Sequence, residues 1–108
     1  MAEESNIQKG IVDYLQMLEN MGKVYFFRNN SFAGTFKRAN GSNGYVKNNK
    51  PGMPDIICLY QGKYVGIEVK SSKGKQTPEQ KKAQEDIERL GGIYLLVRSL
   101  EEVTSVIK

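Results

Sequence analysis

The chain has 108 residues, of which 39% are hydrophobic and 26% charged, and these values indicate one soluble globular domain over residues 1–108. It contains no histidine and one cysteine, which excludes a histidine-based catalytic triad, a histidine-ligated metal and a thiolate metal cage. A metal would therefore bind carboxylates and carbonyls, and such ligands favour Mg²⁺ or Mn²⁺. The net charge of +4 is modest, but its distribution along the chain is uneven.

A helix and a strand are predicted in the first quarter of the chain. Apolar residues recur there at helical spacing, which predicts a helix over about 4–21 that Gly22 ends. The apolar positions of this helix are Ile7, Ile11, Leu15 and Leu18. Residues 24–27 (Val-Tyr-Phe-Phe) indicate a buried strand. Because the start is acidic and polar and no long apolar run occurs, we expect neither a secretory signal nor a membrane anchor.

Residues 31–54 are rich in Gly, Asn and Ser and too long for an ordinary connection, so they are expected to be functional or disordered. The pattern allows a weak hairpin around 40–44, with residues 36–38 facing residues 45–47. No acid occurs between Glu19 and Asp55, although six cations and several aromatic residues fall there. This distribution favours contact with a nucleic-acid backbone. The alternative is a solvated loop that keeps the protein soluble.

The second half of the chain is predicted to contain two paired strands, a helix, a third strand and a short final helix. The strands cover residues 55–60 and 64–70 and are joined at Gln61-Gly62. Thr77 and Gln80 can form a capping box for the helix that follows, and Gly91-Gly92 ends it. A buried strand over 93–97 and a short helix over 99–108 complete an α/β fold, with a mixed β-sheet flanked by helices. The single cysteine, Cys58, lies in an apolar run and fits a reducing, intracellular setting.

The hairpin at Gln61-Gly62 places chemically important side chains together. If these two residues form the turn, Asp55 stands directly opposite Glu68, where two like charges destabilise a sheet unless a cation neutralises them. Strand alternation points Glu68 and Lys70 to one face, beside Gly66, which is expected to leave space. Two acids, a cation between them and a lysine suit metal-assisted phosphodiester hydrolysis. A surface ion pair between Glu68 and Lys70 is the alternative, but it leaves Asp55 unexplained.

A third carboxylate is expected from the first helix. Glu4 lies on the apolar face that must pack on the sheet, whereas Glu3 is turned away by about 100°. An acid on such a face needs a cation or a hydrogen-bond partner. In the competing interpretation Ser5 caps the helix with Gln8, and Glu4 is a flanking acid favoured by the helix dipole.

Several segments resemble one nuclease family. They are residues 52–55 (Gly-Met-Pro-Asp), 67–70 (Ile-Glu-Val-Lys) and 72–80, with further matches at 4–8, 28–30 and 91–92. Together these segments are similar to the VRR-NUC branch of the PD-(D/E)xK nucleases over nearly the whole chain. The sequence departs from the family at Val97-Arg98-Ser99, where the family has Val-Arg-Arg. That segment follows the catalytic strands, so the change affects only a local contact.

The resemblance implies a restriction-endonuclease-like core that cuts DNA with Mg²⁺ or Mn²⁺. It implies metal ligation by Asp55, Glu68 and the carbonyl of Val69, a catalytic Lys70, and a helix acid that maps best to Glu4. It also implies a role for Gln80, although capping explains this residue nearly as well. Stand-alone members of such families, often from phages or bacteria, resemble enzymes that resolve four-way (Holliday) junctions as homodimers.

Two other functions compete with a structure-selective endonuclease. The chain could be a non-catalytic DNA-binding module, although such a module gains nothing from acids that face phosphates. It could also be a nuclease subunit that a partner targets, because no separate domain for reading a base sequence is present. The predicted DNA contacts are Arg28, Asn29, Lys37, Arg38, Lys47, Lys50, Lys73 and Lys75. For each cation the alternative is an ordinary exposed side chain.

Overall fold

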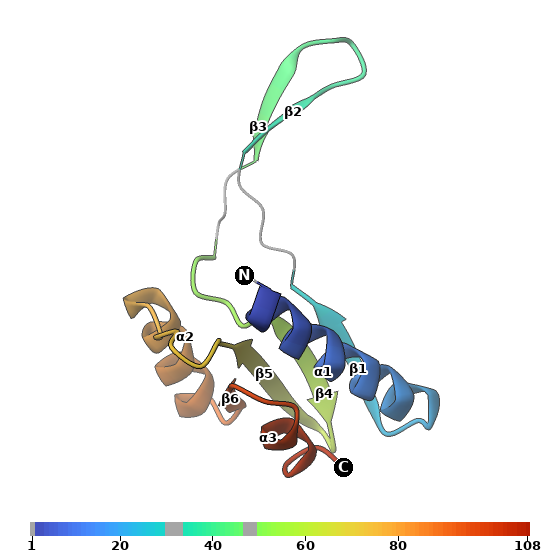
Figure 1. Ribbon diagram of the computed structural model, residues 1–108. Helices are drawn as coiled ribbons and strands as arrows, with labels where there is room; N and C mark the ends of the chain where they lie inside the picture. Colours follow the sequence, from blue (N-terminus) through green and yellow to red (C-terminus); the bar gives the residue numbers. More distant parts are fainter. Residues whose placement is uncertain (1, 30–33, 47–49) are drawn as a thin grey trace.

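Figure 1 shows a computed structural model of the chain, which describes residues 2–29, 34–46 and 50–108. The elements are α1 (Ala2–Asn20), β1 (Val24–Arg28), β2 (Gly34–Lys37), β3 (Asn43–Val46), β4 (Ile56–Tyr60), β5 (Lys63–Val69), α2 (Pro78–Arg89), β6 (Ile93–Val97) and α3 (Glu101–Thr104). Four strands form one sheet in the order β1-β4-β5-β6, and β2 pairs with β3. Because β5 and β6 are parallel while the other neighbours are antiparallel, the sheet is mixed, as predicted.

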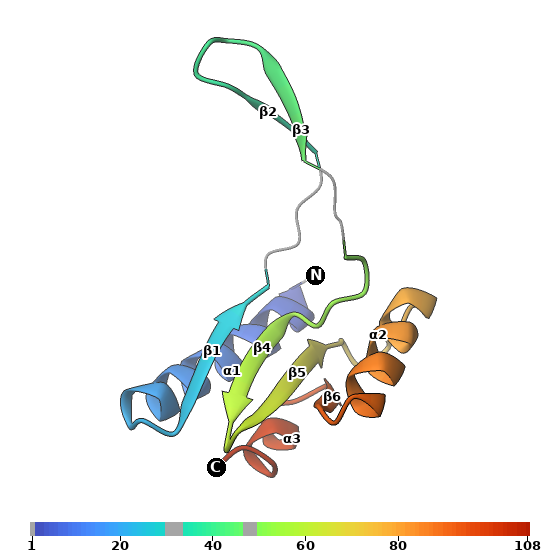
Figure 2. The same cartoon turned by 180° about the vertical axis from the view of Figure 1, so that it is seen from behind.

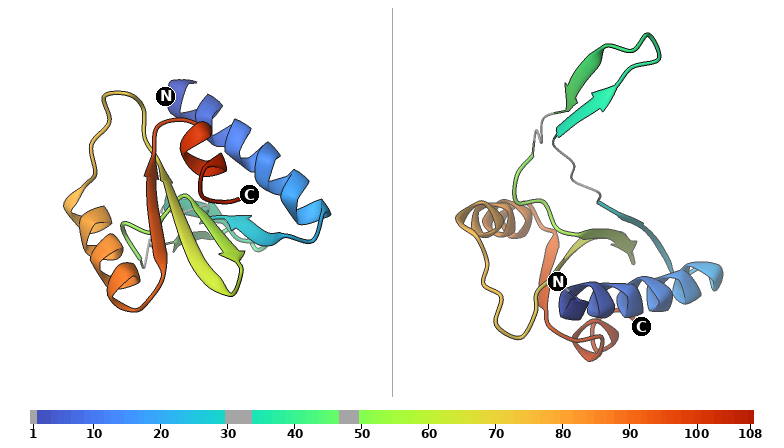
Figure 3. Two further views of the ribbon diagram at one scale, coloured as in Figure 1. Left: turned by 90° about the horizontal axis from the view of Figure 1, so that it is seen from below. Right: turned by 45° about the horizontal axis from the view of Figure 1, so that its top comes forward.

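One face of the four-stranded sheet packs against α1 and α3, and this contact forms the core. Alternate residues of β5 point to this face and are fully buried. They meet the apolar stripe of α1, which is the stripe predicted from helical spacing. The buried core residues contributed by these three elements and by the chain after α3 are Ile11, Leu15, Leu18, Val65, Ile67, Val69, Val103 and Ile107. Figure 3 shows α1 and α3 together on this side of the sheet.

The opposite face of the sheet is only partly covered. Helix α2 lies beside β6, which leaves β1 and β4 open in Figure 2. The exposed fractions of the side chains there are 69% for Tyr25, 53% for Phe27 and 53% for Leu59. The prediction that residues 24–27 form a buried strand is therefore wrong for Tyr25 and Phe27. Strand β1 is an edge strand, and alternation turns these two rings toward the part of this face that α2 does not reach.

The β2–β3 hairpin confirms that a turn occupies the middle of the long loop, but its register differs from the prediction. Phe36 pairs with Gly44, and Lys37 pairs with Asn43, so residues 36–38 do not face 45–47. The shift arises because the turn closes earlier: the Arg38 N–H donates to the Ser42 carbonyl at 2.8 Å, and Gly41 adopts φ +87°. Figure 1 shows this hairpin standing clear of the sheet and helices.

The described helices differ from their predicted bounds mainly at their ends. Helix α1 already includes Ala2, so Ser5 lies inside it, and the interpretation of Ser5 as the N-cap is wrong. Helix α2 has the predicted capping box between Thr77 and Gln80. Helix α3 is much shorter than the predicted 99–108, in keeping with the β-branched residues near the end of the chain, which are weak helix formers. None of the helices in the described ranges is long and apolar enough to cross a membrane.

Candidate active site

The turn between β4 and β5 sets the geometry of the candidate site. Gln61 and Gly62 have φ of +51° and +77°, as a two-residue hairpin turn of this kind requires. Ile56 pairs with Ile67, which is the predicted register. Asp55 directly precedes β4, and its Oδ2 accepts a hydrogen bond from the Val69 N–H at 2.8 Å. The carboxylate of Asp55 is thus held at the end of β5.

Glu68 is the only buried charged residue among those that the structure describes, with 2% of its surface exposed. Its Oε2 accepts a hydrogen bond from Gln80 Nε2 at 3.0 Å and lies 3.7 Å from Lys70 Nζ. Its Oε1 is buried and has no hydrogen-bond partner among the described residues. Leaving a buried carboxylate oxygen without a donor is unfavourable, so this atom is suited to a positive ligand.

The surroundings of Glu68 favour its protonated form. Burial is the largest cause, followed by the negative charge of Asp55 and the closeness of its carboxyl group. Lys70 opposes these effects, and Glu4 adds to them, with the result that the pKa of Glu68 is raised to about 8. The β4–β5 register and the hydrogen bond from the Val69 N–H hold Asp55 next to Glu68, as the hairpin predicts.

Lys70 follows β5 and remains largely buried, with 12% of its side chain exposed. Its backbone N–H donates to the Val97 carbonyl at 2.9 Å, which extends the parallel pairing with β6 by one residue. This contact fixes the backbone from which the ammonium group reaches Glu68. The ion pair considered as an alternative therefore exists, but it is buried next to a second acid rather than lying on the surface.

The space expected beside Gly66 is filled, so that part of the prediction is wrong. A Cβ at Gly66 would lie 2.6 Å from Cγ of Pro54. The proline ring takes this position because its loop is anchored on α2: a Cβ at Gly52 would lie 2.3 Å from the Glu79 carbonyl oxygen. Gly52 also has φ +86°, which favours glycine. This contact brings Pro54, and with it Asp55, over the sheet.

The two acids at the start of α1 have different environments. Glu3 accepts hydrogen bonds from the Ser72 N–H at 3.2 Å and from Ser72 Oγ at 3.4 Å. Glu4 is half-buried, and its charge contributes to the raised pKa of Glu68. Glu3 therefore attaches the helix to the chain after β5, whereas Glu4 is the helix acid whose charge acts on the site.

Sequence reasoning missed two contacts that support the site. Asn29 donates from its backbone N–H to the Asp55 carbonyl at 2.8 Å and from Nδ2 to the Pro54 carbonyl at 3.3 Å. Arg98 donates to the carbonyls of Ser71 and Gly74 at 2.5 and 2.8 Å, which ties β6 to the loop between β5 and α2. No periodic pattern signals either contact, because each joins segments that are far apart in the chain.

The predicted DNA-contact residues fall into separate groups. Arg28 ends β1, Lys37 and Arg38 belong to the β2–β3 hairpin, and Lys73 and Lys75 lie in the loop between β5 and α2. All of these cations are exposed. Asn29 is half-buried against the loop before β4, as described above. Lys50 is exposed near α2, and Lys47 lies outside the described residues.

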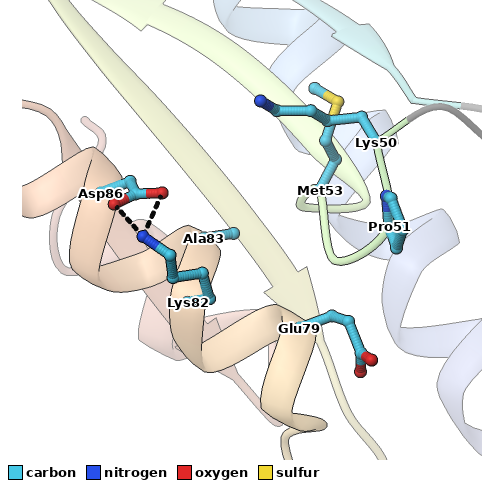
Figure 4. A pocket seen from close by; sticks show the side chains of 7 residues that line it. All are labelled: Lys50, Pro51, Met53, Glu79, Lys82, Ala83 and Asp86. Carbon is cyan, nitrogen blue, oxygen red and sulfur yellow. Dashed lines mark hydrogen bonds and ion pairs between the residues drawn. The ribbon is translucent and has the colours of Figure 1, made fainter.

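Two hollows lie outside the acidic centre. One, of about 280 Å³, is between the loop before β4 and α2, and Figure 4 shows the Lys82–Asp86 ion pair in its wall. It is lined by Lys50, Pro51, Met53, Glu79, Lys82, Ala83 and Asp86. The other, of about 230 Å³, is apolar and lies between Tyr64 and the end of α2. Neither contains Asp55, Glu68 or Lys70.

A metal ion at this centre would meet two carboxylates and not three. Among the described ranges, no three His, Cys, Asp or Glu side chains form a group that could hold a metal ion. Asp55 and Glu68 are nevertheless adjacent, and the free Glu68 Oε1 offers a hard oxygen ligand of the kind that Mg²⁺ and Mn²⁺ prefer. In comparisons with protein-family models and with curated proteins, no significant match to this chain is found.

Proposed function

We propose that this protein is a divalent-metal-dependent DNA endonuclease of the PD-(D/E)xK type, similar to the VRR-NUC branch and with a restriction-endonuclease-like core. The observation that carries the proposal is the buried Glu68, whose carboxylate lies next to Asp55 and 3.7 Å from Lys70 Nζ, with one oxygen lacking a donor among the described residues. A structural ion pair would not require a second acid beside the first. The resemblance at residues 4–8, 28–30, 72–80 and 91–92, which contain none of these three residues, adds support.

In this proposal Asp55, Glu68 and the carbonyl of Val69 would hold Mg²⁺ or Mn²⁺, and Glu4 would supply charge from α1. When bound, the cation would polarise the scissile phosphate and favour ionisation of a nearby water. The Val69 N–H holds Asp55, and Gln80 Nε2 holds Glu68, so both carboxylates are oriented before substrate binds. Lys70 places a positive charge where the phosphate becomes more negative during hydrolysis.

The substrate class follows from charge and from the proposed chemistry. Exposed cations lie on both chain segments that border the site, at Arg28 on one side and at Lys73 and Lys75 on the other. We propose branched DNA, such as four-way junctions, as the preferred substrate. We also propose a homodimer, because cutting two strands symmetrically needs two sites related by a two-fold axis. The open face at Tyr25, Phe27 and Leu59 is a surface of the kind that forms contacts.

A cleavage assay on duplex, flap and four-way DNA with Mg²⁺ or Mn²⁺ tests the activity. Asp55→Asn, Glu68→Gln and Lys70→Ala should each abolish cutting while DNA binding persists. Asp13→Asn, an exposed acid on α1 that pairs with Lys9, is the matched control and should cut normally. Metal-dependent cutting by all three site variants would refute the assignment of these residues.

The same assay separates the competing functions. DNA binding without cleavage of any substrate would favour a non-catalytic module. Cleavage that appears only when a second protein is added would favour a partner-targeted subunit. Analytical ultracentrifugation tests the dimer: Leu59→Lys should shift the protein toward monomer, whereas Met21→Lys, at a residue that is 58% exposed just beyond α1, should not.

A further inference from the structure

The β2–β3 hairpin has an unusual surface for so small an element. Phe36 and Tyr45 are 42% and 66% exposed, and Lys37 and Arg38 are exposed beside them. No acidic residue lies within the hairpin, since none occurs between Glu19 and Asp55. An isolated two-stranded hairpin is marginally stable in water, and the ring of Tyr45 remains 66% exposed on it. Its surface is therefore better explained by a partner than by folding.

One side of the hairpin is organised around a stacked pair. The Arg38 guanidinium carbon lies 5.6 Å from the centroid of the Phe36 ring. Both groups lie across Gly44, where a Cβ would approach the ring within 2.5 Å. Arg38 Nη1 also donates to the Asn43 carbonyl at 2.5 Å. The arginine is thus held in place with part of its guanidinium exposed, which lowers the entropy cost of binding an anion.

The position of the hairpin relates it to the acidic site. The chain leaves the sheet after β1 and returns before β4. Both points are at the end of the strands where Asp55 and the end of β5 lie. The hairpin extends away from this end of the sheet (Figures 1 and 2). The radius of gyration is 15.5 Å, compared with about 13 Å expected for a compact chain of this length. A polyanion bound at the acidic site would therefore lie at the end of the sheet where β1 ends and β4 begins.

We infer that the β2–β3 hairpin is a DNA-binding arm that enters the major groove of duplex DNA next to the scissile phosphate. The inference rests on the proposed function for its partner. The major groove is about 12 Å wide and accommodates a two-stranded β-ribbon. Lys37 and Arg38 would contact phosphates, while Tyr45, on the opposite face from Phe36, would contact sugars or base edges. The arm does not touch the reacting phosphate, so it supplies affinity and not chemistry.

The test measures binding of a 30-base-pair duplex by fluorescence anisotropy at several salt concentrations, with Ca²⁺ in place of Mg²⁺ to prevent cleavage. Lys37→Gln combined with Arg38→Gln should weaken binding roughly 10- to 30-fold near physiological salt and reduce the salt slope by about 2. Lys37→Gln alone should reduce the salt slope by about 1. This variant keeps the contacts of Arg38 with the Phe36 ring and the Asn43 carbonyl. Lys63→Gln combined with Lys108→Gln, at the opposite end of the strands near the β4–β5 turn, makes the same charge change and should have little effect.

Cleavage by the same variants in Mg²⁺ distinguishes the arm from the active site. The arm variants should raise KM and leave kcat at saturating DNA unchanged. If the unmodified protein binds and cuts DNA and the arm variants match the Lys63 and Lys108 control, the arm is refuted and the nuclease stands. If the unmodified protein binds but never cuts, and the arm variants lose affinity, the arm stands and the nuclease fails. Absence of any DNA binding would overturn both.

Discussion

Gln80 connects the cap of α2 to the carboxylate of Glu68. Its Oε1 accepts a hydrogen bond from the Thr77 N–H at 2.9 Å, and its Nε2 donates to Glu68 Oε2 at 3.0 Å. Capping and a role at the site were alternative explanations for this residue, yet one side-chain amide makes both contacts. The start of α2 and the acidic centre are therefore positioned by the same group.

Two substitutions at Gln80 should separate these roles. Gln80→Ala should lose the cap and destabilise the protein by about 1 kcal/mol. Gln80→Glu can keep the capping box but places a second carboxylate against Glu68. It should therefore raise the pKa of Glu68 further and move the acidic limb of the cleavage pH profile upward. Identical pH profiles for Gln80→Glu and the unmodified protein would show that the contact with Glu68 does not matter.

The raised pKa of Glu68 predicts a pH-dependent stability in the absence of metal. The pKa is about 8 in the folded protein, against an ordinary value of 4.5, so the folded state binds more protons between these values. The contribution of Glu68 to the free energy of unfolding should therefore be greatest below pH 4.5. It should fall by on the order of a few kcal/mol as the pH rises toward 8.

Thermal unfolding in EDTA across this pH range measures the effect. Glu68→Gln removes the titrating group and should flatten the curve, and added Mn²⁺ should restore stability at pH 8 to the unmodified protein only. An unchanged pH dependence in Glu68→Gln would contradict the assigned protonation.

Gly52 should tolerate alanine less well than Gly62. At Gly52 an alanine meets both an unfavourable φ of +86° and a backbone oxygen 2.3 Å from its Cβ. At Gly62 φ is +77°, but no atom lies within 4 Å of the added Cβ. We expect Gly62→Ala to cost about 1 kcal/mol and Gly52→Ala roughly 3 kcal/mol or more in urea unfolding. Equal losses would mean that the loop carrying Pro54 is not anchored on α2 as described.

Substitutions at Glu3 and Glu4 test which acid at the start of α1 affects metal binding. Glu4→Gln should lower the affinity for Mn²⁺ measured by calorimetry, because a negative charge near Glu68 is removed. Glu3→Gln should leave that affinity nearly unchanged and instead weaken the attachment of Ser72, detectable as faster amide hydrogen exchange after β5. The reverse pattern would assign the metal-site role to Glu3.

Local patterns in the sequence were enough to predict most of the elements and the centre of the site. Alternation along β5 and the turn at Gln61-Gly62 determine the register, and the register brings Asp55 beside Glu68. Helical spacing identified the core face of α1, and the capping box located the start of α2. These features depend on residues close together in the chain, whose periodicity is visible without any tertiary information.

Other features were decided only by the packing of distant segments. Pro54 fills the space over Gly66, and Arg98 clamps the loop after β5. The rings of Tyr25 and Phe27 stay exposed because α2 lies beside β6 and does not reach β1. The hairpin register also differed, since a Gly-rich strand pair lacks a buried face to specify it. Contacts of this kind depend on which surfaces meet in the folded chain, and the spacing of residues along the sequence does not reveal which surfaces these are.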